Sequence, residues 1–344
     1  MTNEQWEKLL AAIDGEALDP LPVGFIIDSP WLPGWAGIST LDYYCSDEKW
    51  LAANFKAIRE FPEAMFLPGF WSEFGMCTEP SAFGTKCRWA DRDLPFAERV
   101  IKQIEQAADM EKPDPKTDGL LPFAVRRLQL HRKQIEQAGH AIRFAVSRGP
   151  LNIATFLMGT TEFLMAIRTH PDETRTFLTL ITDFIIDWLQ HQKECFPSVE
   201  GVFILDDIVG FLGEEDFRGS ALPYLKRAFG CLDVPVRFFH NDAQGLVCAK
   251  FLNEIGVNLF NFSHEHSLSE MRERAGGEVT LLGNIPPRDV LAQGAPSDVA
   301  ASVQAAVASL DDKRRVILSC GGGVPPDVPS ENIAAFLRSA TQSN

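Results

Sequence analysis

Three metal-binding residue types follow apolar runs that are typical of β-strands. Cys320 comes just after residues 316–318, and His240 and Asp242 come just after residues 236–239. A thiol, an imidazole and a carboxylate can meet only if the fold gathers the ends of these strands. Such a set leaves a fourth position open for substrate, as catalytic zinc sites do. The sequence therefore predicts a zinc site at His240, Asp242 and Cys320, and zinc suggests chemistry on a thiol.

Two histidine positions extend this prediction. His240 and Asp242 are two residues apart, so their side chains point to the same side of an extended chain. His264 and His266 have the same spacing and are predicted to carry protons or to add metal ligands. The alternative is that His240 caps the next helix, Cys320 is a small buried residue, and the other two histidines are solvated.

Strands and helices must alternate to bring these residues together. From residue 201 onward, apolar β-type runs alternate with helical segments, which indicates parallel βα units. The expected strands are 201–205, 234–239, 257–262, 279–282 and 316–318, and the expected helices are 216–229, 244–255, 268–274, 297–310 and 331–340.

The first half of the chain supplies three more strands, at 23–27, 65–67 and 142–146. Eight βα units predict an α/β fold of the (β/α)8 TIM barrel type, in a single domain over 1–344 with the barrel at about 20–340. A doubly wound open sheet is the alternative, but no GxGxxG motif follows the first strand.

Two segments lie outside the regular pattern. Residues 1–13 are predicted to form a helix outside the barrel. Residues 71–95 form a long polar and aromatic stretch without periodicity, and long loops of this kind often act as lids or substrate walls. A local satellite core is the alternative interpretation of its aromatic residues.

The ends of the predicted strands provide the other candidate site residues, because active sites of such barrels lie at the carboxyl ends of the strands. Asp206 is predicted to act as a general acid or base, or to hold a substrate amine; a turn carboxylate or helix N-cap is the alternative. The predicted substrate-binding residues are Asp28, Trp71, Glu73, Phe74, Asp207 and Asn284.

Composition limits the partners of the chain. The net charge of -15, without a basic stripe, argues against nucleic acid. Seven cysteines without a CxxC motif fit reduced thiols in the cytoplasm. The N-terminus does not resemble a signal peptide, and no apolar run reaches the roughly 18 residues that span a bilayer. We expect a cytoplasmic protein that acts on a small molecule, and a homodimer on general grounds.

Three motifs, in this order, resemble the uroporphyrinogen decarboxylase superfamily. They are Ile204-Leu205-Asp206-Asp207 with Gly210, then Leu282-Gly283-Asn284-Ile285-Pro286-Pro287 with Gly294, then residues 321–332. The resemblance covers nearly the whole chain. It implies the same barrel fold. The superfamily includes both porphyrin decarboxylases and zinc- and cobalamin-linked methyltransferases.

Two positions favour the methyltransferase subgroup. The decarboxylases carry an arginine-rich motif of the form RQAGRYLP, but residues 30–35 contain no arginine. They also carry Gly-His-Gly where this chain has Ser319-Cys320-Gly321. The methyltransferases have a His-x-Cys zinc motif and a later cysteine, which His240 and Cys320 match; Asp242 departs from it by replacing the usual cysteine.

The resemblance therefore implies a zinc-dependent methyltransferase that moves a methyl group between a corrinoid and a small nucleophile. The corrinoid is expected on a separate protein. A metal-free decarboxylase of another carboxylated substrate is the alternative, and a binding protein that has lost the chemistry is the third.

Overall fold

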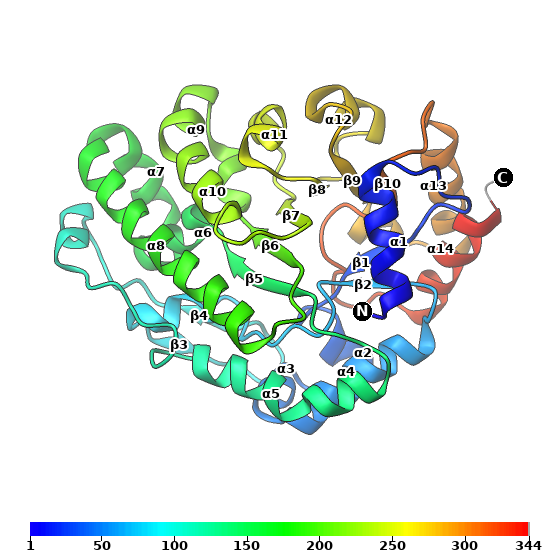
Figure 1. The fold of residues 1–344 in the computed structure, drawn as a ribbon, viewed down its shortest axis with the longest axis horizontal. Coiled ribbons are helices and arrows are strands. Elements are labelled where there is room, and N and C mark those ends of the chain that lie inside the picture. The colour runs from blue at the N-terminus through cyan, green and yellow to red at the C-terminus, as the bar shows by residue number, and fades with distance from the viewer. Residues whose placement is uncertain (343–344) are drawn as a thin grey trace.

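Eight parallel strands build a (β/α)8 barrel in the computed structural model, which describes residues 1–342 (Figure 1). Six of them form one parallel sheet in the order β10-β9-β8-β7-β6-β5. A second parallel pair joins β1 to β2, and bridges from Val23 to Leu318 and from Ile26 to Gly323 connect β1 to β10. The bounds are β1 Gly24–Ile26, β2 Met65–Leu67, β5 Phe144–Arg148, β6 Gly201–Leu205, β7 Val236–Asn241, β8 Leu259–Phe262, β9 Thr280–Ile285 and β10 Val316–Cys320. The predicted barrel fold is confirmed.

Helices surround this barrel and follow the strands along the chain (Figure 1). Their bounds are α1 Asn3–Asp14, α2 Leu32–Ala36, α3 Thr40–Cys45, α4 Asp47–Glu60, α5 Leu121–Gln137, α6 Pro150–Met158, α7 Thr160–Thr169, α8 Pro171–Cys195, α9 Glu214–Ser220, α10 Leu222–Phe229, α11 Leu252–Ile255, α12 Leu268–Ala275, α13 Pro296–Ala308 and α14 Ser330–Gln342. Short 3-10 turns lie at Pro80–Phe83, Ile104–Asp109, Asp207–Phe211 and Val247–Phe251, and a π-helical turn at Pro287–Ala292.

Two predicted helices differ from the structure. Residues 216–229 form two helices, α9 and α10, because Pro223 in the first turn of α10 has no N–H to continue the earlier helix. Residues 244–255 form only a 3-10 turn and the short α11. The chain near Gly245 instead passes so close to Gly210 that an added Cβ would lie 1.8 Å from the Gly210 carbonyl oxygen.

The inside of the barrel is a packed apolar core. Phe203 and Phe238 stack there with ring centroids 4.2 Å apart, as expected for inward-facing side chains of such barrels. Helix α1 closes one end: Trp6 lies edge-on against Phe144 at 5.6 Å, and Thr280 donates a hydrogen bond to the carbonyl of Ala12. The predicted N-terminal helix therefore forms the floor of the barrel.

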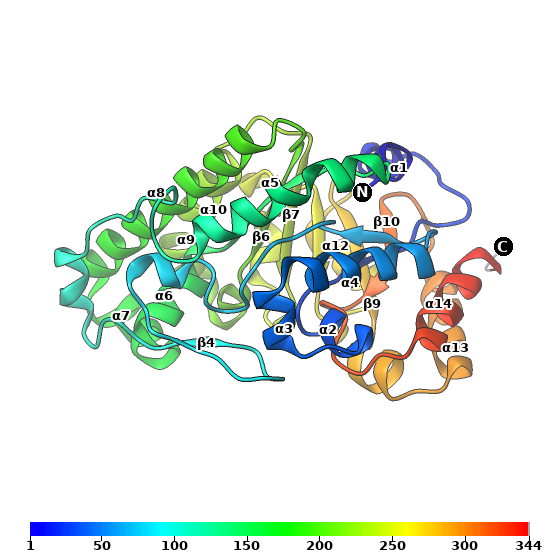
Figure 2. The same cartoon turned by 90° about the horizontal axis from the view of Figure 1, so that it is seen from below.

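The aromatic stretch 71–95 has more structure than a loop. It contains the 3-10 turn Pro80–Phe83 and the first strand of a hairpin, β3 Cys87–Arg88, which pairs with β4 Phe96–Ala97. Figure 2 shows this hairpin at the end of the barrel opposite α1. The hairpin therefore lies at the mouth, where the strands end.

Within residues 1–342, no single helix has the length and hydropathy needed to cross a membrane. Helices α6 and α7 together have sufficient length and apolar composition, but the chain bends by 110° between them.

Candidate functional site

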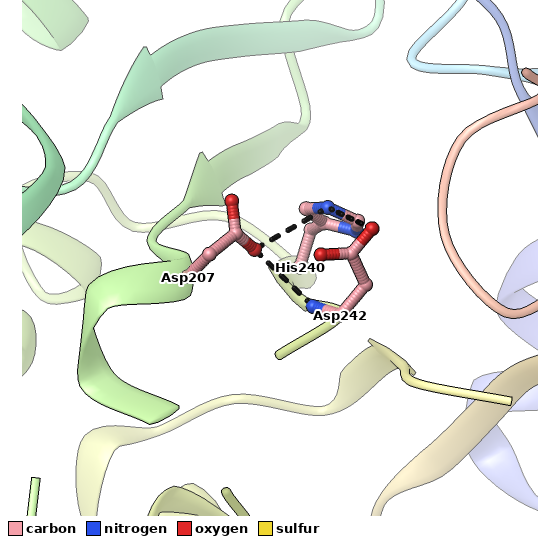
Figure 3. Close-up of side chains that lie close together, drawn as sticks. All are labelled: Asp207, His240 and Asp242. Carbon is pink, nitrogen blue, oxygen red and sulfur yellow. Dashed lines mark hydrogen bonds and ion pairs between the residues drawn. The ribbon is translucent and has the colours of Figure 1, made fainter. Parts of the chain in front are cut away.

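Three side chains with metal-binding atoms meet at the mouth of the barrel (Figure 3). His240 is the last residue but one of β7, Asp242 follows that strand directly, and Asp207 begins the 3-10 turn after β6. The Nε2 atom of His240 lies 3.6 Å from Asp207 Oδ1 and 3.9 Å from Asp242 Oδ2. One potential ligand atom from each lies within 4.8 Å of the others, and His240 is buried while both carboxylates are partly exposed. The site is thus open to solvent on its acidic side.

Asn261 on β8 sets the orientation of the His240 ring. Its amide nitrogen donates hydrogen bonds to the carbonyls of Leu282, at 2.8 Å, and Cys320, at 3.2 Å. The amide oxygen of Asn261 therefore faces His240 Nδ1, 2.8 Å away, and can only accept a proton. Since Nδ1 carries the proton in the neutral ring, the lone pair of Nε2 points toward the two carboxylates. This is the arrangement of a metal-binding histidine with an orienting partner.

Two close backbone approaches position the carboxylates. The backbone N–H of Asp242 donates to Asp207 Oδ1 at 3.2 Å. Gly322, with φ of 121°, lies so near that an added Cβ would be 2.8 Å from Asp242 Oδ2. The glycine-rich turn after β10 therefore leaves room for the Asp242 side chain.

The electrostatics of the cluster favour bound positive charge. Burial raises the pKa of Asp207, and the Asp242 carboxylate raises it further, although His240 opposes this. Burial alone would lower the pKa of His240, but Asp207 and Asp242 outweigh it, so the pKa lies above its usual value. Two carboxylates around one imidazole can be compensated by a proton on His240 or by a divalent cation. A nitrogen and oxygen donor set of this kind is compatible with zinc and with harder divalent metals.

Cys320 lies next to this cluster but is not one of its three members. Its side chain is fully buried, and its Sγ donates to the carbonyl of Gly322 at 3.3 Å. Burial raises the pKa of Cys320 to about 12, so the group is a thiol at neutral pH, whereas metals bind the thiolate. The third member of the cluster beside His240 and Asp242 is Asp207, which was predicted to bind substrate. The role of Cys320 as a metal ligand stays a prediction.

Asp206 is held away from the open cleft. It is fully buried, and its two oxygens accept the backbone N–H groups of Leu151, at 2.8 Å, and Asn152, at 3.1 Å. These are unpaired donors in the first turn of α6, so Asp206 caps that helix from β6. Gly149 allows this contact, because a Cβ there would lie 2.3 Å from Asp206 Oδ2. The capping alternative is thus what the contacts show, and the proton-carrier role stays untested.

An open cleft of about 630 Å³ lies beside Asp242. His264 is exposed and lines it, together with Phe211 and Arg288. His266 turns to other partners: its Nε2 lies 2.8 Å from the carbonyl of Gln244, and its Nδ1 lies 3.3 Å from Glu270. Asn284 donates to the backbone carbonyl of His266. His264 is therefore placed to meet a ligand, while His266 and Asn284 hold the loop between β8 and α12.

A second acidic group faces the mouth from β1 and the early loop. Burial raises the pKa of Asp28 to about 7, and neighbouring Glu73 raises it further while Arg148 and His240 lower it. Burial also raises the pKa of Glu73, whose Oε2 accepts the N–H of Gly75 and whose Oε1 is buried without a hydrogen-bond partner. With a pKa of about 7, the Asp28 carboxyl group can exchange protons near neutral pH.

Trp71 and Phe74, the two aromatic residues predicted to bind substrate, are both buried. Trp71 belongs to the barrel interior, where it lies edge-on to Phe203 at 6.0 Å. Phe74 is buried under Tyr44 and Trp89, with ring centroids 5.9 and 6.4 Å away. Trp71 and Phe74 both pack as core, and their roles in substrate binding stay predictions.

Sequence reasoning did not identify Asn261 or the ion pair between Arg148 and Glu79. Arg148 ends β5, and its guanidinium lies 3.1 Å from Glu79 Oε2 while its backbone N–H donates to Oε1 at 3.0 Å. Two features of the sequence point to these residues. Asn261 is a polar residue inside the apolar run 257–262, and Arg148 is a charged residue at the end of a strand.

The chain matches one family model over nearly its whole length. The family model described as uroporphyrinogen decarboxylase (URO-D) matches residues 4–343. The uroporphyrinogen decarboxylase of Chloroherpeton thalassium is 27% identical over 252 residues, covering 70% of each chain. That of Idiomarina loihiensis is 24% identical over 275 residues, covering 76% of this chain and 74% of the relative.

Solved structures share the fold. A methyltransferase from Methanosarcina mazei superposes with a TM-score of 0.81 over 97% of both chains, at 18% identity. A B12-independent methionine synthase from Shewanella superposes with a TM-score of 0.55, at 11% identity, over 94% of this chain and 96% of that chain. At these identities the likeness shows the barrel and its connections.

Proposed function

The chain belongs to the uroporphyrinogen decarboxylase family, and on that premise we propose that it is a zinc-dependent methyltransferase that moves a methyl group between a corrinoid and a small nucleophile. The carrying observation is the meeting of Asp207, His240 and Asp242, in which the Nε2 atom of His240 faces both carboxylates. The methyltransferase from Methanosarcina mazei, with the same fold across nearly all of its length, supports the proposal.

The residues present fit a divalent metal. His240 supplies an oriented nitrogen and the two aspartates supply oxygens, which leaves coordination positions for Cys320 or for substrate. When bound, zinc at this position would lower the pKa of a coordinated thiol or similar nucleophile. Asn261 fixes the imidazole, and the two carboxylates offset the charge of the cation.

Asp28 is the residue that we assign to proton transfer. Its pKa of about 7 lets it accept the proton that the nucleophile releases and return it to water. It is close enough to His240 for each to influence the other's charge. Burial raises the pKa of Glu73, and its Oε1 atom, buried without a hydrogen-bond partner, can form a hydrogen bond with the substrate.

The size of the cleft suggests how the two substrates arrive. A cleft of about 630 Å³ beside Asp242 and His264 can admit a small nucleophile. A corrinoid macrocycle is larger and would approach from outside the mouth. We therefore propose that the corrinoid is carried by a separate protein.

A decarboxylase is the second candidate, since the curated relatives carry that name. The structure gives a reason to rank it lower. In the segment 30–35, Trp31 and Trp35 stack at 4.7 Å and donate their indole N–H groups to Val328 and Ser330. These indoles cannot neutralise the carboxylates of a polyanionic substrate as arginines would.

Metal content tests the first proposal. Purified wild-type protein is expected to hold zinc in a one-to-one ratio, and His240→Ala and Asp207→Asn to lose it. His264→Gln is the matched control, because His264 is exposed and outside the three-residue cluster, and it should keep the metal. A well-folded wild type that binds no zinc by titration calorimetry would refute the metal site.

Methyl transfer tests the reaction itself. With zinc bound, the protein should demethylate methylcobalamin in the presence of a thiol, which changes the visible spectrum of the corrinoid. Loss of a carboxyl group from uroporphyrinogen by metal-free protein, without any corrinoid reaction, would establish the decarboxylase instead.

A further inference from the structure

A groove of about 760 Å³ lies between the hairpin β3–β4, helix α3 and the starts of α4 and α5 (Figure 1). The hairpin is tied to α3 at this place. The N–H of Leu41 donates to the carbonyl of Asp91 at 3.0 Å. The Thr40 hydroxyl donates to the carbonyl of Arg92 at 3.0 Å. The groove shares no lining residue with the cleft beside Asp242, and its volume is within the roughly 300–1,000 Å³ of small-molecule sites.

Apolar side chains that remain exposed form the walls of this groove. Trp89 is 41% exposed, Phe123 63% and Leu41 37%. Beneath them lie the buried rings of Tyr44 and Phe74, and Trp89 packs edge-on against both, at 5.7 and 6.4 Å. Exposed apolar groups that share one concave surface are typical of ligand-binding grooves. The walls therefore fit a flat apolar body that can stack on an indole or a phenyl ring.

Arg126 brings a positive charge to the same groove. It is exposed on α5 and makes no ion pair or hydrogen bond with any residue of 1–342. The charge of the neighbouring, buried Arg127 is already matched, because its Nε donates to Asp47 at 2.9 Å. The acidic Glu48 lies in the first turn of α4, where the helix dipole stabilises it. Arg126 has no comparable partner, so its N–H donors are available to an anion.

We propose that this groove binds a small planar aromatic carboxylate. The aromatic ring packs on the Trp89 and Phe123 walls, and the carboxylate accepts hydrogen bonds from the Arg126 guanidinium. Arginine suits this contact, because its planar fork of donors matches the two oxygens of a carboxylate. The proposal depends neither on zinc nor on methyl transfer.

Titration calorimetry with 2-naphthoate tests the site on the full-length protein. We expect saturable one-to-one binding. The neutral 2-naphthamide, which has the same ring system, should bind about 10- to 100-fold more weakly, because it cannot form the charge-assisted hydrogen bonds. Equal affinity for the two compounds, or no binding of naphthoate below about 1 mM, would overturn the proposal.

Variants of the groove separate its charge from its walls. Arg126→Gln should weaken naphthoate binding about 10- to 100-fold and leave the binding of the amide unchanged. Arg132→Gln is the matched control: Arg132 lies on the same helix, pairs with Glu136 at 2.7 Å and does not line the groove, so the variant should bind as the wild type does.

Trp89→Ala should weaken the binding of both compounds about tenfold, because both lose a stacking surface. The variant should keep the fold, since Trp89 is 41% exposed. Naphthoate binding at wild-type strength in both Arg126→Gln and Trp89→Ala would place the ligand elsewhere and refute the groove as its site.

A carboxylate could also bind a metal ion at the candidate site, so the titration is repeated with His240→Ala. This variant should bind naphthoate as the wild type does, because His240 does not line the groove. Loss of naphthoate binding in His240→Ala would assign the ligand to the metal cluster and overturn the groove proposal.

Discussion

At the scale of single residues, one amide decides how His240 can act. Asn261 uses both its donors on backbone carbonyls, so its oxygen holds the Nδ1 proton and leaves Nε2 for a metal or a proton. Asp207 and Asp242 face that same atom. The cluster is therefore poised between two states, an imidazolium between carboxylates and a neutral imidazole on a metal.

Asn261→Ala tests this orienting role. Loss of the acceptor should weaken zinc binding by about 10- to 100-fold, because the ring can then rotate and protonate on Nε2. Competition with a chelator of known affinity measures the change. Asn258→Ala is the control: Asn258 bonds Arg237 and Pro235, and the variant should keep zinc affinity. Equal zinc affinity in Asn261→Ala and wild type would contradict the orienting role.

The two states of His240 predict opposite pH dependences. In the metal-free protein the pKa values of His240 and Asp207 are raised above their usual 6.5 and 3.8, so folding favours the protonated forms. Their contribution to stability is present below the usual pKa values and is lost as pH rises through the raised ones. Zinc competes with the His240 proton, so zinc affinity should instead increase over the same rise in pH.

Urea unfolding in the presence of a chelator, and zinc titration in its absence, measure both slopes between about pH 6 and about pH 9. His240→Gln serves as the control, and its metal-free stability should fall less across this window. A zinc affinity that does not change with pH would show that His240 is not a ligand.

At the scale of elements, the buried ion pair of Arg148 with Glu79 joins β5 to the early loop. The two side chains are only 12% and 3% exposed, so removal of one leaves the other charged and unpaired. Arg148→Met should lower the free energy of unfolding by about 3–5 kcal/mol, and adding Glu79→Leu should recover most of that loss. Urea denaturation gives both values.

The exposed pair of Arg99 and Glu162 is the comparison for this prediction. Their side chains are 53% and 40% exposed, and Arg99→Gln should cost less than about 1 kcal/mol. If Arg148→Met cost no more than Arg99→Gln, the loop would not depend on the buried pair.

The same elements show how far the sequence could lead. Strand positions were predictable within a few residues, since the apolar run 201–205 ends at two aspartates and the run 65–67 ends at Pro68-Gly69. The meeting of His240 with Asp242 was also predictable, because they lie two residues apart at the end of one strand. The third member of the cluster was not predictable. Whether Asp207 or Cys320 faces His240 depends on side-chain directions in a 3-10 turn and in a glycine-rich turn.

At the scale of the whole molecule, the barrel separates stability from chemistry along its axis. Helix α1 closes the floor and the hairpin lies at the opposite end (Figure 2). The candidate site lies at the carboxyl ends of β6 and β7. The packed interior between them contains the stacked rings of Phe203 and Phe238. We therefore expect a substitution at the floor to leave the geometry of the site unchanged. Effects at such separated positions usually add without coupling.

Trp6→Ala tests this separation. Trp6 is 4% exposed and fills the floor against Phe144, so its truncation should lower the free energy of unfolding by about 3–5 kcal/mol. Zinc affinity of the folded variant should stay within about 0.5 kcal/mol of wild type. Phe123→Ala is the control for stability, because Phe123 is 63% exposed and should change it by at most about 0.5 kcal/mol. A folded Trp6→Ala protein that unfolds in a single cooperative transition but binds zinc much more weakly than wild type would show that floor and mouth are coupled.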